Sequence, residues 1–142
     1  MKPVVSSAFT SGLKGGLHAF WMGPLIWLAV ALTVNRRDLA RLGFWDFLRD
    51  NAYALPFVAV YSGFFATAVG ATFGAALMVV AASVPRVGLW LLIASGAATG
   101  AATMYLSGPY RGSALATTFG LALGAACACS SWRYFRRHVL AA

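Results

Sequence analysis

The sequence predicts an all-helical integral membrane protein, with four transmembrane helices in a single membrane domain over residues 1–142. Three observations support this fold class. The chain is 61% hydrophobic and only 10% charged, whereas soluble domains carry about 25% charged residues. Its 11 Lys and Arg stand against only three acids, all of them Asp. Uncharged apolar runs repeatedly reach the length of about 20 residues that spans a bilayer. This pattern excludes a soluble enzyme.

The first apolar run predicts a transmembrane helix over residues 15–34. A cleaved signal peptide is the alternative, because Ala29-Val-Ala31 has the small-x-small pattern of a cleavage site. Trp21, Pro24 and Trp27 lie within the run and favour a retained helix instead. The N-terminus also lacks the Arg-rich, amphipathic pattern of a transit peptide.

A polar stretch follows and contains all three acids of the chain. Asn35 is a candidate N-cap for a short amphipathic helix over residues 36–50, whose apolar residues recur every three positions from Leu39 to Leu48. We expect this helix to lie in the headgroup plane of the membrane, where each arginine contributes about 1 kcal/mol of attraction to anionic lipid. Pairing of the arginines with the nearby Asp side chains is the alternative. The candidate headgroup contacts are Arg36, Arg37, Arg41 and Arg49.

Three further apolar runs predict transmembrane helices over residues 57–84, 87–106 and 113–132. Pro56 is expected to divide the long run that begins at residue 52, because proline inside a helix removes a hydrogen bond. Pro85 and a turn over residues 107–112 separate the later helices, and a basic tail covers residues 133–142. Lys and Arg are almost equally divided between the two sides, so the positive-inside rule predicts no orientation.

Each predicted span carries small residues four positions apart, on one helical face. Helices in lipid associate through close backbone approach, which small residues permit. We therefore expect these faces to pack helices together or onto a partner subunit, rather than to form a path for a solute. The candidate packing residues are Gly15, Gly23, Gly70, Gly74, Gly96, Gly100, Gly120 and Gly124.

The sequence offers no constellation for catalysis, and we expect a non-enzymatic protein with no cofactor and no catalytic or metal site. All three Asp lie in one polar stretch, and Cys127 and Cys129 have no second cysteine pair with which to hold zinc. His18 is expected to pack or to lie at the interface rather than to carry protons. The basic residues are spread over the segment ends and form no stripe for nucleic acid.

Motif pieces in the second and third spans resemble the family of mitochondrial preprotein translocase channel subunits and plastid amino-acid transporters. The family signature is small-x2-aromatic-x10-Arg-x3-Asp-x6-small-Gly-x3-Gly, on four helices. Gly70-Ala-Thr-Phe73 resembles its start and Ser95-Gly96-Ala-Ala-Thr-Gly100 its end, at the family's own separation. Arg86 stands two positions later than the signature asks, and the Asp is missing. The chain thus resembles a degenerate member over roughly residues 12–132.

The resemblance is greatest to the branch that forms an accessory subunit of respiratory complex I. It implies a structural subunit of the membrane arm in the mitochondrial inner membrane, with other membrane subunits as partners and phospholipid or cardiolipin as a bound component. An import channel would favour acidic helix faces, and the spans contain no acid. A preprotein or solute translocase of the same family and an unrelated small bacterial membrane protein are the alternatives.

Overall fold

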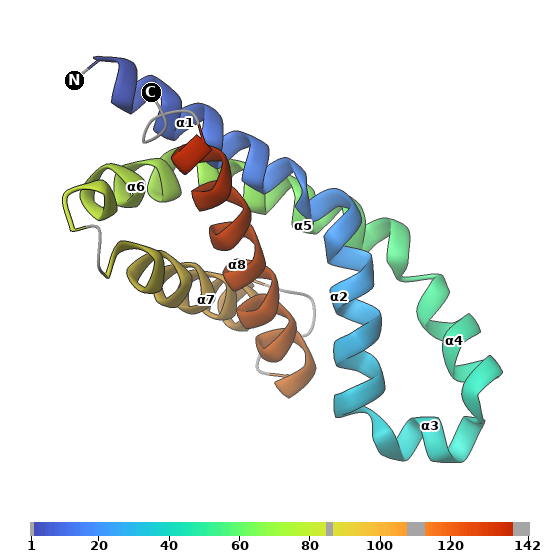
Figure 1. Ribbon diagram of the computed structural model, residues 1–142. Helices are drawn as coiled ribbons and strands as arrows, with labels where there is room; N and C mark the ends of the chain where they lie inside the picture. Colours follow the sequence, from blue (N-terminus) through green and yellow to red (C-terminus); the bar gives the residue numbers. More distant parts are fainter. Residues whose placement is uncertain (1, 85–86, 108–112, 138–142) are drawn as a thin grey trace.

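A computed structural model describes residues 2–84, 87–107 and 113–137, and in these residues all regular structure is helical (Figure 1). Pro85, Arg86, residues 108–112 of the predicted turn and residues 138–142 of the predicted basic tail lie outside the described residues. The elements in chain order are α1 (Lys2–Leu17), α2 (Ala19–Val34), α3 (Arg36–Leu42), α4 (Phe44–Ala52), α5 (Leu55–Val69), the π-helical segment η1 (Gly70–Gly74), α6 (Ala75–Ala82), α7 (Gly88–Ser107) and α8 (Ala114–Phe135).

Three helices are long and apolar enough to cross a membrane, which is compatible with a multi-pass membrane protein. They are Leu55–Ala82, Gly88–Leu106 and Ala114–Phe135, close to the last three predicted spans. A fourth span exists only if the bent pair Val4–Leu17 and Ala19–Val34 crosses as one unit.

The first predicted helix differs from the structure at its start and in its shape. Helix begins at Lys2, not at residue 15, and a bend of 47° separates α1 from α2 at His18. The bend follows Gly15 and Gly16, because adjacent glycines have low helix propensity. The His18 ring stabilises the bend by donating through Nδ1 to the Lys14 carbonyl oxygen at 2.7 Å.

The predicted interfacial helix is two shorter helices, α3 and α4. Gly43 separates them with φ of 81°, a backbone conformation that side chains with a Cβ rarely adopt. The predicted cap is wrong, since the Asn35 side chain makes no capping hydrogen bond in the structure. We call α3 and α4 together the arm, because they lie at the far ends of α2 and α5, away from α7 (Figure 1).

The long second span is one helical rod in which Pro56 starts the helix rather than dividing it. Proline is well tolerated in a first turn, where its missing N–H has no intrahelical partner to lose. The rod changes register at η1, whose wider turn accommodates one extra residue. Gly12 of α1 contacts the rod at this wider turn, beside Gly70.

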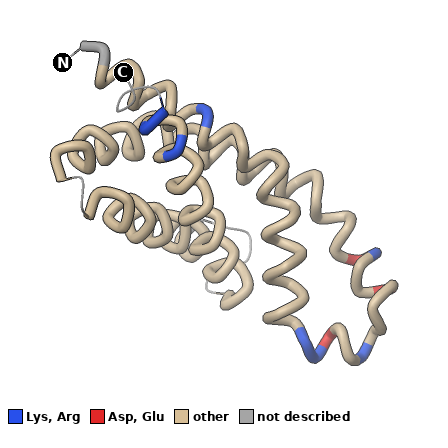
Figure 2. The backbone as a smooth tube through the Cα atoms, viewed as in Figure 1, with Lys and Arg blue, Asp and Glu red and all other residues tan. Residues whose placement is uncertain are grey.

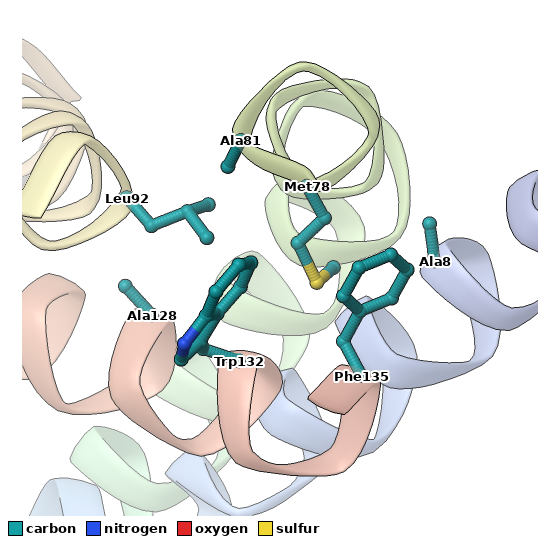
Figure 3. Close-up of a cluster of buried hydrophobic side chains, with 7 residues drawn as sticks. All are labelled: Ala8, Met78, Ala81, Leu92, Ala128, Trp132 and Phe135. Carbon is teal, nitrogen blue, oxygen red and sulfur yellow. The ribbon is translucent and has the colours of Figure 1, made fainter. Parts of the chain in front are cut away.

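The helix α8 joins the two halves of the hydrophobic core. One buried cluster gathers four helices around Trp132 and Phe135 of α8, which point toward Met78 of α6 (Figure 3). The other cluster lies nearer the start of α8, where Trp27 and Phe119 meet edge to face with ring centroids 5.3 Å apart. The Ser113 side chain caps this end of α8 by accepting from the Ala116 amide at 3.1 Å.

Candidate helix-packing and lipid-contact sites

The predicted glycines of the third and fourth spans face one another along α7 and α8. A Cβ added at Gly96 would lie 2.6 Å from the Gly124 carbonyl oxygen, and one added at Gly100 would meet the Gly120 carbonyl oxygen. Real Cβ atoms do not approach so closely, so the two backbones are in direct contact. We call this contact the α7–α8 seam. Only glycine fits these positions without a shift of one helix.

Glycines of the first two spans meet backbone or serine side chains across the helix contacts. A Cβ at Gly70 would lie 2.6 Å from the Gly12 carbonyl oxygen, whereas Gly15 faces Ser131 and Gly23 faces Ser62. Ser62, only 1% exposed, donates from Oγ to the Ala19 carbonyl oxygen at 3.0 Å. This bond joins α2 to α5 at a contact where the small residues Gly23 and Ser62 allow the two helices to approach closely.

Four residues of these contacts are absent from the predicted packing set, and Ser62 is one of them. Gly12 and Gly16 touch the α5–η1 backbone, and the buried Ser131 touches Gly15. The four-residue spacing of Gly12 and Gly16 could have indicated a packing face. It was not recognised because the predicted span began at residue 15 and so excluded Gly12.

Gly74 differs from the other predicted packing glycines, because a Cβ added there would contact only the Val69 carbonyl oxygen, at 3.6 Å. The residue instead lines an apolar groove of about 100 Å³ between the α5–α6 rod, α7 and α8. We call it the central groove. Phe65, Phe73 and Leu77 line its rod side, and Thr99 and Thr103 line its α7 side. No acidic or basic side chain is among the described residues that line it.

The arm carries the four candidate headgroup arginines on two helices, and all four are exposed. Arg49 lies 3.6 Å from Asp46, in an exposed ion pair, so for this residue the structure shows the pairing alternative. The predicted apolar face divides: Phe47 is buried, whereas Trp45 is 77% exposed. Exposed aromatic rings beside arginines are typical of the membrane interface.

Neutralising the arm should change which lipids surround the protein. In nanodiscs of mixed phosphatidylglycerol and phosphatidylcholine, we expect the triple variant Arg36→Gln/Arg37→Gln/Arg41→Gln to lose several-fold of its phosphatidylglycerol enrichment, because each arginine contributes about 1 kcal/mol near an anionic surface. Lipid mass spectrometry of the purified discs measures the enrichment. Equal lipid compositions for the variant and the parent protein would contradict a lipid role for the arm.

The two cysteines point to different sides of α8. Cys127 lines the central groove, whereas Cys129 lines a second cleft, on the side of α8 that faces the bend at His18. Both are free thiols. Among the described residues, no group of three or more His, Cys, Asp or Glu side chains lies close enough to hold a metal ion.

Comparisons with protein-family models, with curated proteins and with solved structures find no match to this chain. The resemblance to the translocase family therefore remains an expectation drawn from motif pieces. The structure by itself establishes an all-helical chain with three to four helices fit to cross a membrane.

Proposed function

We propose that this chain is a non-catalytic structural subunit of a larger membrane assembly, and we favour the membrane arm of mitochondrial respiratory complex I on the motif resemblance. The observation that carries the structural role is the central groove, in which Gly74 presents a glycine face that no other helix of the described residues covers.

Most glycine faces of the chain are already occupied by its own helices. Gly96, Gly100, Gly120 and Gly124 contact one another, and Gly70 contacts α1. A helix is about 10 Å across with its side chains, so the groove of about 100 Å³ admits only part of one. The uncovered glycine leaves room for a side chain from a helix of a neighbouring subunit that packs against the groove. The apolar lining of the groove matches the side chains that such a helix presents.

The proposal is tested by Gly74→Leu, which places a side chain in the groove and whose Cβ meets only the Val69 carbonyl oxygen, at 3.6 Å. We expect this variant to fold in detergent and to lose most of its comigration with a large assembly on native gels, because the leucine fills the space that a side chain of the partner would enter. The matched control is Ala76→Leu, which adds a similar bulk at an exposed position of α6 outside the groove.

Migration of the parent chain decides among the functional alternatives. Comigration with a respiratory complex after mild extraction supports the subunit role. Crosslinks to a substrate in transit, or substrate-dependent conductance in liposomes, would favour the translocase. A small free oligomer whose migration does not change with Gly74→Leu would contradict the structural role.

A further inference from the structure

A second cleft, of about 500 Å³, lies between the bend at His18 and the carboxyl-terminal end of α8. Its lining includes Ala126, Ser130, Arg133 and Tyr134 on α8 and Arg137 two residues beyond the end of that helix. Spacings of three and four residues place the α8 side chains on one face of the helix. We call it the basic cleft. It lies on a different face of α8 from the central groove, so a ligand in the basic cleft is independent of the structural role proposed for the chain.

The opposite wall is formed by the helix bend, and two side-chain contacts join it to α8. His18 donates through Nδ1 to the Lys14 carbonyl oxygen, and its Nε2 lies 3.3 Å from the Tyr134 hydroxyl oxygen, within hydrogen-bond distance. The Lys14 ammonium lies 5.7 Å from the centroid of the Tyr134 ring, within reach of a cation–π interaction. The contacts of His18 and Lys14 with Tyr134 therefore hold the helix bend against α8 along one side of the cleft.

The cleft has an excess of positive charge with no acidic side chain to balance it. Arg133 and Arg137 line the cleft, Lys14 lies next to it against the Tyr134 ring, and every Asp of the chain lies in residues 38–50 of the arm. Figure 2 shows the separation: blue segments of α1 and of the end of α8 lie together, whereas the red segments lie along the arm.

Helix dipoles offset only part of this charge. Both α1 and α8 end at the cleft, and each helix C-terminus is equivalent to about half a negative charge. Together they offset about one of the three positive charges. The amino-terminal end of α2 lies at the same bend and carries about half a positive charge, which cancels part of the negative charge of the two C-termini. A net positive charge of about two therefore remains for a bound anion.

The chemistry of the lining selects the kind of anion. Arginine forks bind phosphate oxygens in pairs, and Arg133 and Arg137 lie one turn apart with the Ser130 hydroxyl on the same face. The other end of the cleft is apolar, with Met22, Ala126 and the 58% exposed Trp21. The cleft is also at the end of the α8 candidate span, the level at which headgroups lie.

We propose that the basic cleft binds the phosphate group of a phospholipid, held by Arg133 and Arg137 with Lys14 beside them, while an acyl chain lies along Trp21 and Met22. A free phosphate ester presents the same polar chemistry without the apolar part. A phospholipid and a free phosphate ester are therefore distinguished by whether acyl chains increase the affinity of the ligand for the cleft.

The test is titration of the detergent-purified full chain with dioctanoyl phosphatidylglycerol in 0.5 M salt, with bound lipid counted by native mass spectrometry. This salt concentration screens purely electrostatic contacts at the exposed arginines of both the arm and the cleft. We expect one lipid per chain, and Arg133→Gln/Arg137→Gln should weaken its binding at least tenfold. The matched control, Arg37→Gln/Arg41→Gln, removes the same charge from the arm and should change the affinity less than twofold.

Three further measurements complete the design. Glycerol phosphate should bind at least tenfold more weakly than the lipid; equal affinity would overturn the phospholipid assignment in favour of a free phosphate ester. Dioctanoyl phosphatidylcholine should also bind more weakly, because its choline cancels the phosphate charge. Arg133→Lys/Arg137→Lys keeps the charge and should restore part of the affinity. Equal losses in the cleft and arm variants, or equal binding of phosphatidylcholine, would overturn the site.

Discussion

Replacement of Gly100 by Leu is expected to separate α7 from α8 and to lower the melting temperature of the detergent-solubilised chain by up to about 10 °C. Even the Cβ of the new side chain would meet the Gly120 carbonyl oxygen. Overpacking a tight contact costs about 1–3 kcal/mol and occasionally more, and here the obstacle is backbone, which cannot rotate away. Circular dichroism during heating measures the change. Gly96→Leu should act similarly, because it meets Gly124 on the same seam.

The control for the seam is Gly74→Leu, which adds the same side chain where a Cβ meets only the Val69 carbonyl oxygen, at 3.6 Å. We expect its melting temperature to stay within a few degrees of the parent chain, although its assembly with partners is lost. A Gly100→Ala variant should fall between the parent and Gly100→Leu. If Gly100→Leu melted like Gly74→Leu, backbone contact along the seam would not hold the two helices together.

The second large effect is expected at Phe135, whose side chain is fully buried between Met78, Ala8 and Trp132 (Figure 3). Phe135→Ala leaves a cavity at the meeting point of α1, α6 and α8. Removal of a buried phenyl ring costs about 3–5 kcal/mol in soluble cores. We expect the lower end of that range here, because in lipid the loss comes mainly from packing contacts. Denaturant titration in mixed micelles measures it.

Phe57→Ala is the matched control, because that ring is 78% exposed on α5. Substitutions at exposed positions change stability by about 0.5 kcal/mol or less. Phe135→Leu, which keeps most of the volume, should lose less than Phe135→Ala. Similar losses for Phe57→Ala and Phe135→Ala would mean that the cluster does not stabilise the fold.

The later helices were predicted well because proline, glycine and charged residues in the sequence mark where each apolar run begins and ends. The predicted span 87–106 became Gly88–Ser107, and the predicted span 113–132 became Ala114–Phe135. The start of the first helix, at Lys2, was missed because no local pattern in the sequence marks it. Residues 2–13 mix Ser and Thr with apolar residues, yet Ser11 is buried against neighbouring helices. Small polar residues serve in close helix contacts, so hydropathy underestimates such a segment.

The candidate sites show the same division between local pattern and three-dimensional arrangement. Spacing identified the glycines, but it did not reveal that Gly70 faces α1 whereas Gly74 faces an open groove. That difference arises at η1, where the wider turn changes the face that each residue presents. Tyr134 was missed as well, because its contact with His18 joins residues 116 positions apart and depends on the bend between α1 and α2.

The place of α8 in both core clusters has a consequence for biosynthesis. Helices leave the ribosome in chain order, and α8 follows every helix that it contacts. Until α8 is inserted, Met78, Ala8 and Trp27 lack the rings that bury them, and the glycines of α7 lack their backbone partners. Before α8 is made, the chain therefore has only part of its packing, chiefly the contacts of α1 and α2 with the α5–α6 rod. The remaining faces stay uncovered until translation delivers the helix that completes them.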